Sequence, residues 1–274
     1  MCGIVGIVGG TAATSCGGLT VRRMADRIRH RGPDGDGVWS DAEAGIALSQ
    51  RRLAIIDLSS AGAQPMISHN GRHVIVFNGE IYNHGEMRAH LDRQFGVHAW
   101  RGHSDTEVFL NAIEALGITK ALELAVGMFA FGVWDRRERT LVLGRDRLGE
   151  KPLYYGRIGK AFAFASELKA FQPLPDWRPE IDRDALALMM RHNYIPAPYC
   201  IYQGIRKLRP GHFLVLADPQ RDPRVESYWS ASEVAAQGQR HPFQGSPEEA
   251  VDEVERQLRR SLEGQMIADV PLGA

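Results

Sequence analysis

The chain has 274 residues, of which 44% are hydrophobic and 24% are charged, as is usual for a globular protein. Lys and Arg together number 33, and so do Asp and Glu, so no net charge attracts nucleic acid or an anionic membrane. No apolar run reaches the roughly 20 residues that a membrane span needs. The 3 cysteines are too few for a disulfide framework, which favours a reducing, cytoplasmic compartment.

Cys2 directly follows the initiator methionine, whose removal is favoured by a small neighbouring side chain. The mature chain would then carry a thiol and a free α-amine on one residue. Such an amine has a pKa of about 7.7–8.0, so near pH 7 it can accept the proton of the thiol. A cysteine at this position is, by itself, more often an incidental residue of a frayed terminus. The apolar segment 3–8 that follows predicts a buried strand, which would hold the thiol in place.

Short strands and helices alternate over the first 170 residues. We expect strands at residues 3–8, 45–49, 73–77, 128–135, 140–144 and 161–165. We expect helices at residues 19–30, 86–95, 105–116 and 166–170. The strand at 128–135 is apolar on both faces, which indicates burial between two layers. Together these elements indicate an α+β layered architecture.

The last third of the chain begins with a proline-rich stretch at 171–200, which encloses a short helix expected at 183–191. An apolar run follows at 213–216, and the small polar residues 231–245 indicate a linker. Residues 246–249 read Ser-Pro-Glu-Glu, a capping box with proline at the first helical position. An amphipathic helix is therefore expected over 247–264, with an apolar stripe of Val251, Val254, Leu258 and Leu262.

Nine short motifs occur in a fixed order along the chain. They are MCGIVG (1–6), RGPDG (31–35), RLAIID (52–57), QPM (64–66), NGEIYN (78–83), SDTE (104–107), GMFAF (127–131), RDRLGEKPLYY (145–155) and ASELK (165–169). In this order they resemble the class II glutamine amidotransferases, and most closely the glutamine-hydrolysing asparagine synthetases. The resemblance covers the chain from end to end.

The resemblance implies the N-terminal-nucleophile hydrolase fold, a four-layer sandwich with two antiparallel sheets between helical layers. It implies that Cys2 is the nucleophile, which forms a glutamyl thioester and releases ammonia. It also implies that Asn78 and Gly79 form the oxyanion hole. An amide side chain and a backbone N–H beside a glycine are suitable donors for this task. In isolation, Asn78-Gly79 is also an ordinary turn signal.

The amino-acid end of glutamine would be bound by charged residues. By resemblance, Arg52 holds the α-carboxylate, which a guanidinium can grip with two parallel hydrogen bonds. Asp105 holds the α-amine in the same family, and Glu80 offers a further acceptor for an ammonium group. Taken alone, Arg52 also fits a surface ion pair, and Asp105 fits a helix N-cap with Ser104 as its competitor.

Two departures from the family pattern stand out. Ser49-Gln50 occupy the place where the family commonly has Gly-His, and Ala54 stands where serine is frequent. The first departure leaves open what replaces any hydrogen bond of that histidine. The segment 145–155 is expected to be structural, with no role in the chemistry.

The resemblance divides the chain into an amidotransferase domain (1–230), a linker (231–245) and the truncated start of an ATP-dependent synthetase domain (246–274). The ATP loop of that domain would follow residue 274, so we expect glutamine hydrolysis without asparagine formation. The glutaminase half is expected to need no metal or cofactor, because Mg-ATP would belong to the missing domain. The expected partners are glutamine, the missing synthetase domain and, as a candidate, a second copy of the chain in a homodimer.

Alternative functions remain at this point. Glucosamine-phosphate synthase, phosphoribosyl-pyrophosphate amidotransferase and amidotransferases of polysaccharide tailoring would keep the fold and change the acceptor. The motifs at 78–83 and 145–155 favour asparagine synthetase over the first two and do not exclude the third. A glutamine-binding or assembly module without enzymatic activity is a further alternative, against which the presence of Cys2 with all its partner positions argues.

Overall fold

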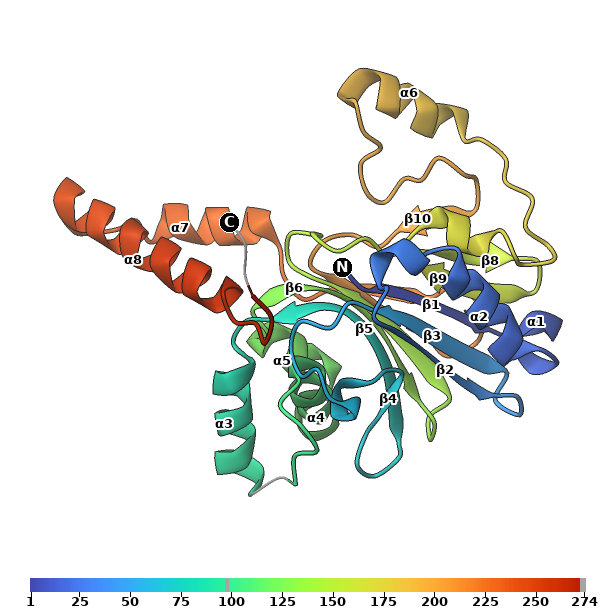
Figure 1. The fold of residues 1–274 in the computed structure, drawn as a ribbon. Coiled ribbons are helices and arrows are strands. Elements are labelled where there is room, and N and C mark those ends of the chain that lie inside the picture. Colours follow the sequence, from blue (N-terminus) through green and yellow to red (C-terminus); the bar gives the residue numbers. More distant parts are fainter. Residues whose placement is uncertain (97–98, 272–274) are drawn as a thin grey trace.

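The computed structural model describes residues 1–96 and 99–271, which form two sheets covered by helices (Figure 1). Each sheet has six strands, and every pair of neighbours is antiparallel. The first sheet has the order β10 (Ile205–Lys207), β8 (Tyr154–Ile158), β9 (Ala161–Ala165), β1 (Gly3–Val8), β3 (Ile46–Arg52) and β2 (Gly35–Asp41). The second has the order β12 (Arg224–Ser227), β11 (His212–Leu216), β7 (Thr140–Arg145), β6 (Gly127–Asp135), β5 (His73–Ile81) and β4 (Met66–Ile67).

Helices cover the outer face of each sheet, so that the architecture has four layers. Helices α1 (Gly10–Thr14) and α2 (Gly17–Asp26) pack on the first sheet. Helices α3 (His84–Phe95), α4 (Asp105–Leu116) and α5 (Ile118–Leu124) lie on the side of the second sheet (Figure 1). One apolar cluster fills the space between the two sheets. A second cluster lies between the first sheet and its helices, and a third lies between the second sheet and its helices. Burial of these apolar faces is the main force that holds the layers together.

Strand β6 shows how the sequence specifies the layers. Phe129 and Phe131 point to the helical side, where they contact Phe77 and Phe109 at ring-centroid distances of 5.2–6.2 Å. The alternate residues Ala130 and Trp134 belong to the core between the sheets. Successive strand residues point to opposite faces, so a strand that is apolar at every position must be covered on both sides.

Most expected elements form, and three have exact bounds. Strand 3–8 is β1, strand 161–165 is β9 and helix 105–116 is α4, whereas β3 and β5 extend beyond the expected strands. The helix expected at 19–30 ends at Asp26 and is followed by the 3₁₀ turn η1 (Arg29–Arg31). The helix expected at 166–170 is wrong. There the Ser166 hydroxyl accepts a hydrogen bond from the Ile4 N–H at 3.0 Å, and only the 3₁₀ turn η3 (Leu168–Phe171) forms.

The C-terminal third contains three helices. Helix α6 (Arg183–His192) projects above the sandwich in this view, and α7 (Ala231–Arg240) and α8 (Pro247–Gln265) extend to its left (Figure 1). The segment 231–245, which we expect to be a linker, contains helix α7 in its first ten residues. The Ser230 hydroxyl accepts a hydrogen bond from the N–H of Glu233 and so caps the N-terminus of this helix.

Helix α8 begins with the predicted capping box, in which Ser246 and Glu249 each bind the other's backbone N–H. Its predicted apolar stripe is 59–66% exposed (Val251, Val254, Leu258 and Leu262). The division of the chain into domains stays a prediction, and its last three residues, 272–274, lie outside the described part.

Candidate active site

One pocket of about 160 Å³ lies at the edge where β1, β3 and β5 come together. Its lining includes all six residues singled out from the sequence: Cys2, Arg52, Asn78, Gly79, Glu80 and Asp105. They come from four separate segments. Cys2 precedes β1, Arg52 ends β3, residues 78–80 lie in β5, and Asp105 begins α4. The antiparallel register pairs Gly3 with Arg51, which brings the ends of β1 and β3 together.

The Cys2 side chain is held by the backbone of Leu53. The Leu53 N–H donates to the Cys2 Sγ at 3.4 Å, and the Leu53 carbonyl oxygen lies 3.5 Å from the same sulfur. Arg31 fixes the main chain, because its Nε donates to the Cys2 carbonyl at 2.8 Å. Burial raises the pKa of the Cys2 thiol. A partly buried thiol with a raised pKa needs a base before it can act as a nucleophile.

The N-terminal amine lies beside this thiol and belongs to Met1 in the structure. Burial, more than any other influence, lowers the pKa of this amine. The positive charges of Arg31 and Lys151 lower it further, and the Cys2 sulfur and Glu80 oppose them. A lowered pKa increases the neutral fraction of the amine, which is the form that accepts a proton.

Asn78 is buried inside β5, and its side-chain amide has no partner among the described residues. Both Oδ1 and Nδ2 lack a hydrogen bond. Leaving a buried polar group unpaired costs about 1–3 kcal/mol. Since the residue lines the pocket, a ligand oxygen there would give the amide a hydrogen-bond partner.

Gly79 is needed for close packing of two strands. The interpretation of Asn78-Gly79 as a turn is wrong, because Gly79 pairs with Phe129 in the middle of the β5–β6 ladder. A Cβ atom at this position would overlap the carbonyl oxygen of Met128. The absence of a side chain therefore allows β6 to approach the strand that carries Asn78.

Arg52 carries a positive charge that no acidic side chain neutralises in the described part of the chain. Its guanidinium donates to the Ser59 carbonyl at 3.2 Å and to the Asp57 carbonyl. Both acceptors lie in the loop before the 3₁₀ turn η2 (Ser60–Gly62), and a Cβ at Gly62 would overlap the guanidinium. The alternative of a surface ion pair is therefore wrong, and the charge is available for an anionic ligand.

Asp105 and Glu80 supply negative charge to the same pocket. Ser104, and not Asp105, caps α4, because its hydroxyl accepts from the N–H of Glu107. Asp105 accepts from the N–H of Ile81 at 2.8 Å and from that of Thr106 at 2.7 Å. Burial raises the pKa of both Asp105 and Glu80. A cationic ligand group would restore the stability of their charged forms.

Comparison with known proteins agrees with this geometry. The family model of the glutamine amidotransferase domain matches residues 1–229. The chain belongs to this family. Asparagine synthetase [glutamine-hydrolyzing] 1 of Bacillus subtilis is 34% identical over 276 residues, which cover 100% of this chain and 41% of that protein. The second such enzyme of the same organism is 33% identical over 96% of this chain and 36% of its own length. The chain thus spans less than half of these relatives.

A solved structure shows the same fold at lower identity. Glutamine phosphoribosylpyrophosphate amidotransferase from B. subtilis, complexed with ADP and GMP, superposes with a TM-score of 0.60 and is 19% identical. The match covers 83% of this chain and 49% of that structure. The prediction of an N-terminal-nucleophile sandwich with two antiparallel sheets is confirmed. The prediction of a glutaminase domain is confirmed at the level of the family.

Lys151 is a pocket residue of the amidotransferase domain that sequence reasoning missed. It lines the pocket and is only 6% exposed. Its N–H donates to the buried Asp146 carboxylate at 3.1 Å, and its carbonyl accepts from Arg145 Nε at 2.7 Å. The segment 145–155 was expected to be structural only. Its motif gives no hint that its lysine reaches a pocket whose other residues are all more than 20 positions away in the sequence.

Two glutamines fix the strand residue before Asn78. Gln50 Nε2 donates to the Phe77 carbonyl at 3.1 Å, and Gln64 Oε1 accepts from the Phe77 N–H at 2.6 Å. The departure from the family pattern at Ser49-Gln50 therefore places a side-chain donor against β5. Ser49 points elsewhere and donates to the Gly37 carbonyl at 2.7 Å.

Metal-binding and membrane-spanning features are absent from the described residues. No group of three or more His, Cys, Asp or Glu side chains within 1–96 and 99–271 is arranged to hold a metal ion. Over the same residues, no helix combines the length and the apolar character of a membrane span. Cys2, Cys16 and Cys200 are all free thiols.

Proposed function

We propose that this domain hydrolyses glutamine to glutamate and ammonia through a thioester on Cys2. The observation that carries the proposal is the convergence of three kinds of group in one pocket. These are a partly buried thiol, a buried amide without a partner among the described residues, and charges of both signs. Glutamine presents one matching group for each of them: an amide carbon, its oxygen, and the zwitterionic α-amino acid end.

The charged residues orient the substrate. The α-carboxylate binds the guanidinium of Arg52, whose planar fork suits a carboxylate. The α-ammonium binds Asp105 and Glu80, whose raised pKa values reflect buried carboxylates that gain from a cation. With both ends held, the side-chain amide is directed to the thiol of Cys2. Such positioning turns the attack into an effectively intramolecular step.

The chemistry then uses the α-amine and the thiol of Cys2. After removal of Met1, the α-amine of Cys2 takes the proton of the thiol, and the sulfur attacks the amide carbon. Asn78 Nδ2 and the Gly79 N–H stabilise the negative charge that develops on the amide oxygen. The protonated amine gives its proton to the leaving nitrogen, and ammonia departs from the thioester. Water, activated by the same amine, attacks the thioester, which releases glutamate and restores the thiol.

The activity of the whole protein is a further part of the proposal. We propose that the domain supplies ammonia to an ATP-dependent synthetase domain that amidates aspartate, because the relatives above are named as glutamine-hydrolysing asparagine synthetases. Mg-ATP would belong to that second domain, whereas the glutaminase chemistry uses only groups of this chain.

Three free thiols support a reducing compartment, so we place the protein in the cytoplasm. A homodimer stays a prediction. The exposed stripe on α8 is an apolar surface that a second copy or the synthetase domain would cover.

A glutamine analogue that alkylates the active thiol tests the proposal. Intact mass after incubation with 6-diazo-5-oxo-L-norleucine should show one adduct, located on an N-terminal Cys2 from which Met1 has been removed. Glutamate release measured with glutamine alone should be abolished in Cys2→Ala and unchanged in Cys16→Ala. Labelling at Cys16 or Cys200, or equal turnover by Cys2→Ala, would contradict the assignment.

A further inference from the structure

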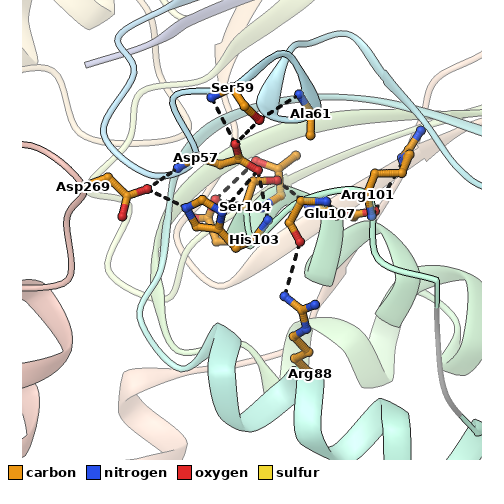
Figure 2. Close-up of polar contacts among 12 residues, drawn as sticks. Asp57, Ser59, Ala61, Arg88, Arg101, His103, Ser104, Glu107 and Asp269 are labelled. Carbon is orange, nitrogen blue, oxygen red and sulfur yellow. Dashed lines mark hydrogen bonds and ion pairs between the residues drawn. The ribbon is translucent and has the colours of Figure 1, made fainter.

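Asp269, which follows α8 by four residues, contacts the glutamine pocket's supporting loops (Figure 2). Its Oδ2 accepts from the N–H of Asp57 at 2.7 Å and lies 2.7 Å from His103 Nε2. Its own N–H donates to the Ile55 carbonyl at 2.9 Å. One residue of the C-terminal segment therefore holds the chain near both position 57 and position 103.

Asp57 is the centre of this cluster. Its side chain is fully buried and accepts from the N–H and hydroxyl of Ser59 and from the N–H of His103 at 2.9 Å. Its φ of 56° is uncommon for a residue other than glycine, so the surrounding bonds must hold it there. Asp269 provides the bond to its N–H. The bonds to its carboxylate come from the 53–59 loop and from the segment before α4.

Two of the proposed ligands for the amino-acid end of glutamine, Arg52 and Asp105, rest on these segments. The carbonyls of Asp57 and Ser59 are the acceptors for the Arg52 guanidinium. His103 is two residues before Asp105, in a segment that Glu107 also fixes through the N–H groups of Arg101 and Gly102. A displacement of this cluster would move Arg52 and Asp105 together.

We propose that Asp269 is a positioning residue for glutamine binding, which couples the segment after α8 to Arg52 and Asp105. The proposal rests on the glutamine site proposed above. It means that withdrawal of the 266–271 segment weakens glutamine binding, and that bound glutamine in turn holds this segment in place, since coupling between two sites is reciprocal. Helix α8 would thereby be linked to the state of the pocket, although its helical residues do not line it.

Steady-state kinetics of the full chain test the coupling. Asp269→Ala should raise KM for glutamine by about three- to tenfold with kcat nearly unchanged, because only the binding of the amino-acid end is affected. Asp269→Asn should have a smaller effect, since it keeps an acceptor for the Asp57 N–H and loses the charge beside His103. Asp252→Ala, at an exposed position on α8, is the matched control. An unchanged KM in Asp269→Ala, or a loss of kcat alone, would overturn the proposal.

Binding and hydrogen exchange separate this proposal from the proposed reaction. In a Cys2→Ala background, calorimetric titration with L-glutamine should show a weaker Kd when Asp269→Ala is added. Amide exchange should accelerate at 54–59 and 101–105, in addition to 266–271, while the exchange of the β-sheet core is preserved. Acceleration confined to 266–271 would refute the coupling. If the native chain bound glutamine without hydrolysing it, the proposed reaction would be refuted. The calorimetric titration and the amide exchange would still decide whether the coupling holds.

Discussion

The N–H of Leu53 donates a hydrogen bond to Sγ of Cys2 at 3.4 Å. Leu53 directly follows Arg52, so the thiol and the guanidinium are attached to the same end of the β1–β3 pair. The proposed nucleophile and the proposed carboxylate ligand are therefore held in a fixed relation by a strand ladder. A site on rigid elements keeps its geometry better than one on loops.

Cys2→Ala should abolish glutamate release, because no other thiol lies in the pocket, and should leave the unfolding midpoint nearly unchanged. A permanent N-terminal extension on the native sequence should be almost as harmful, since it converts the catalytic amine to an amide. Activity assays of both proteins, with a cleavable form of the same extension as control, decide the question. Full turnover by the extended protein would show that another group is the base.

Arg52→Lys should raise KM for glutamine by about tenfold or more, because a lysine cannot form the two parallel hydrogen bonds of a guanidinium. The effect on kcat should be smaller, since the arginine binds the end of glutamine that does not react. Initial-rate measurements over a range of glutamine concentrations give both constants. A collapse of kcat at unchanged KM would place Arg52 in the chemical step instead.

Asn78→Ala should lower kcat by about 10²–10³-fold, as expected for the loss of one oxyanion donor. The free energy of unfolding of this variant should not decrease through the loss of a hydrogen bond, because the amide of Asn78 has no partner in the described structure. Urea unfolding and single-turnover kinetics on the same protein sample distinguish the two effects. A marked loss of stability with normal kcat would show that the amide has a structural role.

Lys151→Met should shift the acidic limb of the kcat/KM profile to higher pH. In the structure the N-terminal amine is that of Met1, whose pKa Arg31 and Lys151 lower and Glu80 and the Cys2 sulfur raise. The Cys2 amine left by the removal of Met1 is one residue further along the chain, and we expect Lys151 to act on its pKa in the same direction. Removing one cation favours the protonated amine, so the amine pKa rises and the base becomes active only at higher pH. Lys120→Met, at an exposed position of α5, is the control. An acidic limb that stays in place would exclude this electrostatic role.

Gly79→Ala should destabilise the fold by about 1–3 kcal/mol or more, because the added methyl group overlaps the Met128 carbonyl and must push two strands apart. Gly85→Ala is the matched comparison, since no atom lies within 4 Å of a Cβ at that position in α3. It should be neutral or should stabilise by about 0.5–1 kcal/mol, as expected for alanine in a helix. Equal unfolding midpoints for the two variants would contradict this account of Gly79.

Local patterns predicted the elements whose burial follows a simple period. Strand β9 and helix α4 have the expected bounds, and the capping box at Ser246 starts α8 as expected. Two errors occur where a distant contact overrides local preference. Ser166 binds the N–H of Ile4 and so does not begin a helix, and Asn78-Gly79 continues a strand because β6 pairs with it. The polar segment at 231–240 forms a helix, because Ser230 caps its N-terminus. Its small polar composition indicated a linker, and the capping serine was overlooked.

The sequence by itself determined the family and the chemical groups of the site, because the motifs lie in order along the chain and a side chain carries its chemistry wherever it is placed. The tertiary structure alone decided which further groups join them. Lys151 enters the pocket and Asp269 reaches Asp57 from 212 residues away because the two sheets and the returning C-terminal segment bring these positions together. Such contacts depend on the closing of long loops. Neither residue spacing nor composition contains that information.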